Sequence, residues 1–185
     1  MNLSKLFEMQ KELDDYIVKT KGLEGQDLLP QKILALQVEL AECANEWRGF
    51  KYWSEDKEAR TKKHKTIPTP DGYASEVINP LLEEYVDCLH FVLSIGLEIG
   101  VPTDHPYSYD NVFEGETPVD LFQYCFNDIA MYVKDGMTFN DCFHFLQLIR
   151  DFISLGLILG FIWDEIETAY HTKWEINKQR QVSGY

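Results

Sequence analysis

Two pairs of acidic residues, each inside an apolar helical segment, are the groups in this sequence best suited to chemistry. The first pair is Glu39 and Glu42, and the second is Glu84 and Asp87. Each pair has the i, i+3 spacing that places both carboxylates on one face of a helix. Carboxylates rarely enter an apolar face unless they are paired or bound to a cation. Two such helices side by side would supply oxygen ligands for a hard divalent ion such as Mg²⁺.

The segment around the second pair is almost entirely apolar. Between Tyr85 and Leu97, the only strongly polar residues are Asp87, His90 and Ser94. Their spacing places them along one narrow stripe of the helix, with no Lys or Arg to pair with them. A solvated face on a surface helix is the simplest alternative, but such a face normally carries charges of both signs.

A second polar stripe lies near the C-terminus. Tyr170, Lys173, Asn177 and Arg180 recur at intervals that place them on one helix face. In a chain this acidic, a basic and amide-bearing stripe could receive phosphate oxygens, and Arg can bind two of them at once. A solvated terminal helix is the alternative. The aromatic cluster at 50–53 (FKYW), which directly follows the helix of the first acidic pair, could stack on a planar base or simply pack.

Composition narrows the classes of function. The chain has 185 residues, 45% of them hydrophobic, which suits a single domain with a sizeable core. Its net charge of −14 repels nucleic-acid backbones, so we expect no nucleic-acid partner, although a small phosphorylated substrate remains compatible. No apolar stretch is long enough to cross a membrane, and the N-terminus is charged rather than signal-like. We therefore expect a cytoplasmic protein.

The four cysteines form no CxxC pair, which favours buried free thiols over a zinc site or disulfides. They are Cys43, Cys88, Cys125 and Cys142.

Hydrophobic periodicity predicts helices almost throughout the chain. We expect all-α architecture with about six main helices, in which two helical hairpins form a four-helix core and a C-terminal helix and tail are added. The predicted helices cover about 2–20, 30–47, 74–100, 117–134, 138–160 and 163–180. The charged, proline-containing segment 54–72 and the segment 101–118 are predicted loops. No segment shows the alternation of a strand.

A faint internal repeat supports the two hairpins. Residues 87–91 (DCLHF) are echoed by residues 141–145 (DCFHF), so 30–100 and 117–160 would be degenerate copies within one domain, 1–185. The second copy has Met137 and Thr138 where the first has Glu83 and Glu84. Only the first copy could therefore hold a metal between acidic pairs.

Four segments together resemble the dimeric, all-α dUTPases, which belong to a larger group of all-α nucleoside triphosphate pyrophosphatases that includes the MazG proteins. The resemblance covers nearly the whole chain. Its carriers are MQKELDD at 9–15, ELAECANEWRGFKYW at 39–53, EEYVDCLHF at 83–91 and YHTKWEINKQRQVSGY at 170–185. The acidic motifs are shared by the larger group, whereas FKYW and the C-terminal motif point to the dUTPase branch.

The resemblance implies a homodimeric enzyme that hydrolyses dUTP, and also dUDP, to dUMP with Mg²⁺, for which Mn²⁺ could substitute. By motif, Glu39, Glu42, Glu84 and Asp87 would be the metal ligands. One of the first two would also orient or deprotonate the attacking water.

The resemblance also assigns nucleotide contacts. Gln10 would contact the uracil edge and Trp53 would stack near the base. The phosphate-binding or closing residues would be Lys173, Asn177, Arg180 and Tyr185. One departure from the family pattern is Trp174, which stands where many relatives have Asn after the lysine.

Three other interpretations compete with this one. A MazG-like pyrophosphatase would share the acids but prefer another base. A di-iron carboxylate bundle would use the Asp-x-x-His pairs that end at His90 and His144, although such bundles use Glu rather than Asp. A non-enzymatic helical interaction protein would carry the acids as a solvated face. If the chain is a dUTPase, we expect both histidines to be core or supporting groups rather than ligands.

Overall fold

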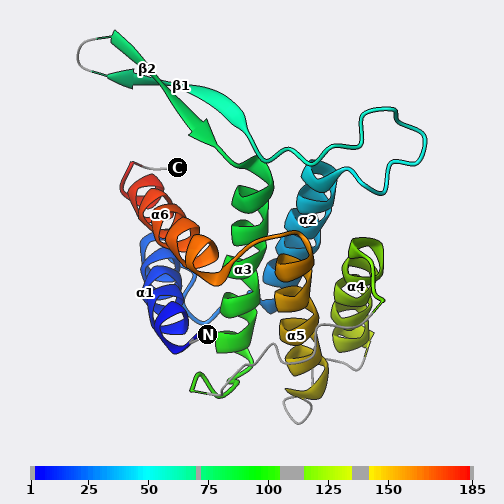
Figure 1. The fold of residues 1–185 in the computed structure, drawn as a ribbon. Coiled ribbons are helices and arrows are strands. Elements are labelled where there is room, and N and C mark those ends of the chain that lie inside the picture. Colours follow the sequence, from blue (N-terminus) through cyan, green and yellow to red (C-terminus); the bar gives the residue numbers. More distant parts are fainter. Residues whose placement is uncertain (1–2, 70–71, 105–114, 135–141, 184–185) are drawn as a thin grey trace.

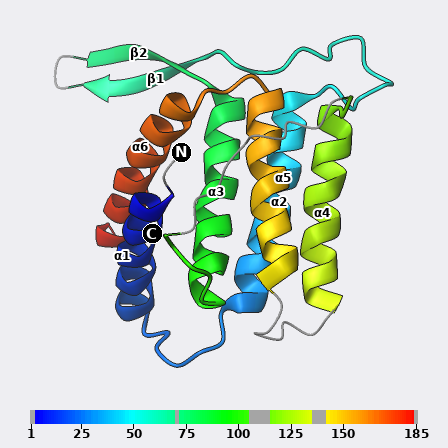
Figure 2. The same ribbon diagram turned by 60° about the horizontal axis from the view of Figure 1, so that its bottom comes forward.

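Six helices run roughly alongside one another in the computed structural model, which describes residues 3–69, 72–104, 115–134 and 142–183 (Figures 1 and 2). The all-α prediction is confirmed. The helices are α1 (Ser4–Lys21), α2 (Leu29–Trp47), α3 (Pro80–Glu98), α4 (Pro118–Lys134), α5 (Cys142–Ile158) and α6 (Trp163–Val182). The predicted start of the fifth helix, at residue 138, lies outside the described residues.

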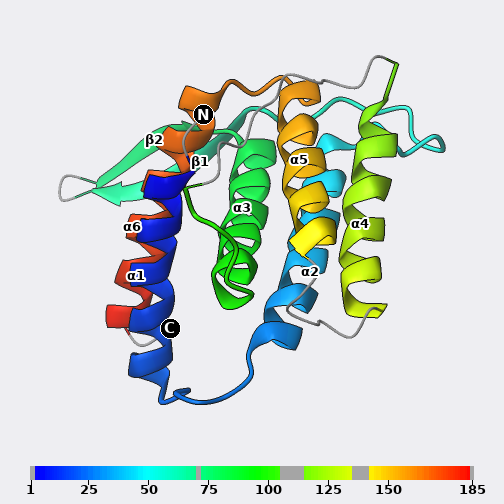
Figure 3. The same ribbon diagram turned by 90° about the horizontal axis from the view of Figure 1, so that it is seen from below.

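Helix α3 is the centre of the bundle. It packs against α2 and α5 on one side and against α1 and α6 on the other (Figures 2 and 3). Helix α4 packs against α5 and α2, at the far side from α1. The closest helix pairs are α2 with α3 and α4 with α5, as the two predicted hairpins require. Side chains on different faces of α3 therefore meet residues from both halves of the bundle.

The sequence of α3 explains its central position. The Asn79 side chain caps the helix by accepting a hydrogen bond from the backbone N–H of Leu82, and Pro80 occupies the first turn. Farther along, the buried Tyr85 ring stacks on Phe152 of α5, with ring centroids 4.4 Å apart. The Tyr85 hydroxyl donates to the Phe152 carbonyl oxygen, so α3 and α5 are joined by stacking and by a hydrogen bond.

The predicted loop is confirmed for residues 54–62, but a β-hairpin between residues 63 and 78 corrects the rest of the prediction. Strands β1 (Lys63–Thr69) and β2 (Gly72–Ile78) pair antiparallel, with Lys63 opposite Ile78. We expected a loop as far as Gly72 and helix from residue 74, whereas α3 begins only at Pro80. Nearly every residue of the hairpin is exposed, and it projects from the bundle (Figure 1). Apolar and polar residues alternate along a strand when one of its faces is buried. These strands have no buried face, so their sequence lacks the alternation by which a strand is predicted.

The cysteines of the described residues lie inside the helical bundle. Cys43, Cys88 and Cys125 are buried and free, as predicted, while the side chain of Cys142 lies outside the described residues.

No single described helix is long and apolar enough to cross a membrane. One sharply bent pair, His144–Ile158 with Trp163–Val182, reaches that length only when both helices are counted together.

A buried carboxylate pair lies between α4 and α5. Asp128 and Asp151 are 6% and 3% exposed, and the Gln147 amide donates to both oxygens of Asp151 at 3.0 Å. Asp128 Oδ2 has no hydrogen-bond partner among the described residues. Burial, reinforced by the Asp151 charge, raises the pKa of Asp128 to about 7, although His144 and Arg150 act in the opposite direction.

This pair predicts a pH-dependent stability. Because the pKa of Asp128 is raised above its unfolded value, the stability it contributes is present below about pH 4 and is lost as pH rises through 7. Asp128→Asn should therefore raise Tm relative to wild type at pH 8 and less, or not at all, at pH 5. Thermal melts of the two proteins across that range test this. Equal Tm differences at both pH values would contradict it.

Candidate active site

Three of the four predicted metal ligands converge in space. Glu39 and Glu42 come from the C-terminal half of α2, and Glu84 comes from the first turns of α3. Each offers a carboxylate oxygen within 4.8 Å of the other two. Among the described residues, no other group of three or more Asp, Glu, His or Cys side chains meets this criterion. The antiparallel packing of α2 on α3 brings the end of one helix beside the start of the other.

The carboxylates in this cluster destabilise one another when ionised. Burial, followed by the charges of Asp87 and Glu42, raises the pKa of Glu39 to about 7. Burial, followed by the charges of Asp87, Glu39 and Glu42, also raises the pKa of Glu84 to about 7. Half-buried carboxylates that repel one another are stabilised by a cation. Hard oxygen donors in this number suit Mg²⁺ or Mn²⁺, so the side chains present fit the expected ion.

Asp87 completes the acidic set but is hydrogen-bonded to α6. Lys173 Nζ donates to Asp87 Oδ2 at 2.5 Å, across 86 positions of sequence. Burial raises the pKa of Asp87, while the charges of Lys173 and Arg180 lower it. The charge of Asp87 in turn raises the pKa values of Glu39 and Glu84. The structure therefore places two cations of the C-terminal stripe beside the acidic cluster.

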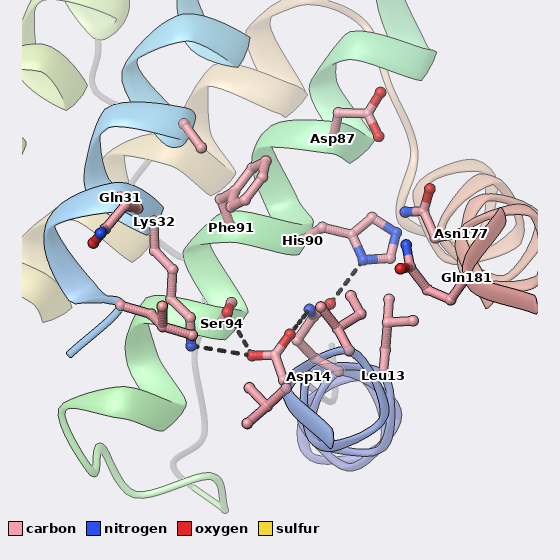
Figure 4. Close-up of a pocket in the computed structure, with 15 residues that line it drawn as sticks. Leu13, Asp14, Gln31, Lys32, Asp87, His90, Phe91, Ser94, Asn177 and Gln181 are labelled. Carbon is pink, nitrogen blue, oxygen red and sulfur yellow. Dashed lines mark hydrogen bonds and ion pairs between the residues drawn. The ribbon is translucent and has the colours of Figure 1, made fainter. Parts of the chain in front are cut away.

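A cavity of about 410 Å³ adjoins the cluster at Asp87, between α1, α2, α3 and α6 (Figure 4). Two of the predicted nucleotide contacts, Gln10 and Asn177, line it together with Asp87. Its remaining walls combine apolar and polar side chains, including Leu13, Asp14, Ile17, Lys32, His90, Phe91, Ser94 and Gln181. A cavity of this size, in which polar side chains converge between apolar walls, is typical of a small-ligand site.

The other predicted contacts are placed differently. Trp53 is 65% exposed, packs edge-on against Phe50 and Tyr52, and does not line the cavity. Tyr185 lies outside the described residues. Trp174, the departure from the family pattern, is largely buried, and its indole N–H donates to the Met9 carbonyl oxygen at 2.8 Å. It therefore anchors α6 to α1 instead of facing the acids.

Comparison with known families decides between the competing interpretations. The sequence model of a family described as dUTPase matches residues 2–67 and 74–185. The chain belongs to this family. The predicted membership of the all-α dUTPases is thereby confirmed, and the activity of the enzyme is hydrolysis of dUTP. The interval between the two matched segments falls in the β-hairpin. No curated protein matches the chain.

The site of this dUTPase contains side chains for which sequence analysis predicted no role. Asp14, Lys32 and Gln181 line the cavity from three different helices. Asp14 and Gln181 fall in segments that carry the family resemblance, but sequence analysis assigned neither a role, and Lys32 lies outside those segments. His90 and Ser94 stood out as polar residues in an apolar helix, and both line the same cavity. The di-iron interpretation required His90 to join the carboxylate cluster as a ligand. Instead, His90 is hydrogen-bonded to Gln10 and is not part of that cluster.

Proposed function

We propose that this dUTPase hydrolyses dUTP, and also dUDP, to dUMP with Mg²⁺ held by Glu39, Glu42, Glu84 and Asp87, and that Mn²⁺ can replace Mg²⁺. The observation that carries the proposal is the convergence of three of these carboxylates beside a cavity of nucleoside size. Bound magnesium would neutralise phosphate charge and lower the pKa of an attacking water.

The protein's own groups would position the substrate and move the proton. Glu39 or Glu42 would accept the proton of the attacking water, since both carboxylates face the cluster. Lys173 and Arg180 already lie close enough to Asp87 to influence its pKa. When a triphosphate arrives, these cations would bind its oxygens and offset the charge that develops during hydrolysis.

The cavity would receive the nucleoside. Gln10 and Asn177 would contact it from α1 and α6, two helices that pack against each other. Trp53 stacking near the base and Tyr185 closing over the phosphates remain proposals that rest on the family resemblance alone. The exposure of Trp53 leaves its ring accessible to a ligand or to a second subunit.

We further propose that the enzyme is a cytoplasmic homodimer. Leu34 and Val38, one turn apart on α2, are 61% and 47% exposed, and an apolar pair of this kind favours a contact between subunits. Sedimentation measurements would test the dimer.

A nucleotide panel tests the proposed activity. We expect pyrophosphate release from dUTP and phosphate release from dUDP in the presence of Mg²⁺ or Mn²⁺, and loss of both when EDTA removes the metal. Turnover of dCTP and dTTP should be slower by at least about 100-fold, because they differ from dUTP at the base that the site must read. Equal turnover of all pyrimidines, or a preference for another base, would favour a MazG-like pyrophosphatase. Unchanged activity in EDTA would refute the metal requirement.

A further inference from the structure

A chain of hydrogen bonds along one wall of the cavity begins at Asp14 of α1. The Ser94 hydroxyl donates to Asp14 Oδ2 at 2.5 Å, and Lys32 Nζ lies 3.5 Å from the same oxygen (Figure 4). Oδ2 therefore accepts from a hydroxyl group and lies beside an ammonium group.

The carboxylate of Asp14 fixes the orientation of the Gln10 amide. Gln10 Nε2 donates to Asp14 Oδ1 at 2.7 Å, so Gln10 Oε1 must face the other way. On that side the Tyr170 hydroxyl donates to Oε1 at 2.8 Å. The two ends of a glutamine amide are usually hard to tell apart, but here an acceptor-only neighbour decides between them.

The orientation of Gln10 in turn fixes the tautomer of His90. His90 Nδ1 lies 2.7 Å from Gln10 Oε1, and because that oxygen can only accept, Nδ1 must carry the hydrogen. The imidazole is neutral, since burial and the charge of Lys173 lower the pKa of His90 to about 3. A neutral ring that is protonated at Nδ1 has a bare lone pair at Nε2.

That lone pair has no partner in the described part of the chain. His90 is 5% exposed, and its Nε2 atom is buried without a hydrogen bond. The ring is held in place by stacking on Tyr170, with centroids 4.1 Å apart. It points toward Asn177 and Gln181 of α6 (Figure 4). Gln181 Oε1 is a second buried acceptor without a partner. Two buried acceptors without hydrogen-bond partners therefore lie at this end of the cavity, and a ligand could donate to them.

We propose that His90 Nε2 accepts a hydrogen bond from the ring N3–H of uracil and thereby gives this dUTPase its preference for uracil over cytosine. The inference rests on the proposed hydrolysis of dUTP. Uracil carries a hydrogen on N3, whereas cytosine has a lone pair there, so cytosine would place two acceptors face to face. The second hydrogen of the Gln10 amide can donate to a uracil carbonyl beside N3–H. Thymine has the same N3–H, so its rejection must depend on other residues.

The variant His90→Asn tests this assignment, because Asn can still donate to Gln10 Oε1 but has no acceptor at the position of Nε2. We expect kcat/KM for dUTP to fall by about 10- to 100-fold, as for the loss of one buried hydrogen bond. The residual rate with dCTP should be unchanged, so the dUTP/dCTP ratio should fall by the same factor. The dUTP/dTTP ratio should be preserved. His171→Asn, at a partly exposed position on α6, is the matched control and should alter neither ratio.

A measurement on the unmodified enzyme remains decisive if the variant does not fold. In a ¹⁵N NMR spectrum, His90 Nε2 should have the shift of an unprotonated nitrogen, and dUMP but not dCMP should move that signal. A protonated Nε2, or no response to dUMP, would overturn the proposal. So would a uracil preference that survives in His90→Asn. If His90 bound the 3′-hydroxyl of the sugar instead, the wild type would turn over 3′-deoxy-dUTP more slowly than dUTP, and His90→Asn would remove that difference. The dUTP/dCTP ratio would then stay unchanged, which would also overturn the proposal. Failure of wild type to hydrolyse dUTP would instead refute the proposed function.

Discussion

Replacing Glu84 by Gln is expected to lower kcat/KM for dUTP by at least about 1,000-fold, which corresponds to about 4 kcal/mol of lost transition-state stabilisation. The substitution removes one of the three converging carboxylates while retaining the size of the side chain. Loss of a ligand from a metal cluster weakens both the binding of the ion and its placement against the phosphates. Steady-state kinetics at saturating Mg²⁺ would measure the loss in kcat/KM.

The same substitution should stabilise the metal-free protein. Burial raises the pKa of Glu84 to about 7, above its unfolded value, so its stabilising contribution is lost as pH rises through 7. At pH 8 the ionised side chain therefore destabilises the fold, and a neutral Gln relieves that effect. We expect Glu84→Gln to have a higher Tm than wild type in EDTA, and a smaller rise in Tm when Mg²⁺ is added.

Glu83→Gln is the matched control, because it removes the same charge from the neighbouring, exposed position of α3. It should keep full activity and lose a little stability, since Glu83 lies in the first turn of the helix, where a negative charge is favourable. If Glu84→Gln retained activity, or if both variants lost it equally, the acidic cluster would not be the catalytic centre.

The largest loss of stability is expected from Gly156→Ala in α5. A Cβ atom at this position would contact the Tyr85 hydroxyl and lie 2.6 Å from Tyr85 Cζ. Tyr85 cannot move aside easily, because its ring is 1% exposed, stacked on Phe152 and hydrogen-bonded to the Phe152 carbonyl. Overpacking of this kind costs about 1–3 kcal/mol, and the rigidity of the site predicts the upper part of that range. Urea denaturation would give the change in the free energy of unfolding.

A double-mutant cycle tests the cause of that loss. Tyr85→Phe alone should cost about 1 kcal/mol, the value of one hydrogen bond. Combined with Gly156→Ala it removes the closest contact, so the double variant should be less destabilised than the sum of the two single changes. If the two changes in the free energy of unfolding were strictly additive, the contact with Tyr85 would not be the cause of the destabilisation by Gly156→Ala. Because Tyr85 adjoins Glu84, Gly156→Ala should also lower activity.

The acidic cluster could be predicted from sequence because the residues that form it are close together along the chain within each helix. The spacing within each pair fixes a common helix face, and the apolar residues around Glu39 and Glu84 require the two helices to pack. The same reasoning placed Lys173, Asn177 and Arg180 on one face of a helix. It could not show that Lys173 would meet Asp87, because that contact depends on how α6 crosses α3.

Other features had no local signal. The β-hairpin was missed because its residues are exposed and need no alternation. The tautomer of His90 depends on Gln10 and Asp14, which lie about 80 positions away on α1 and act only through the packed bundle. The sequence predicted a supporting histidine, and its hydrogen-bond direction requires the whole network of side chains.

Anomalous diffraction from crystals of this dUTPase grown with Mn²⁺ and a non-hydrolysable dUTP analogue would test the central claim most directly. We expect an anomalous peak bounded by the carboxylates of Glu39, Glu42 and Glu84, with the phosphate chain of the analogue against the peak and the base in the adjoining cavity. A bound nucleotide with no metal at these carboxylates, or a metal held elsewhere in the protein, would contradict it.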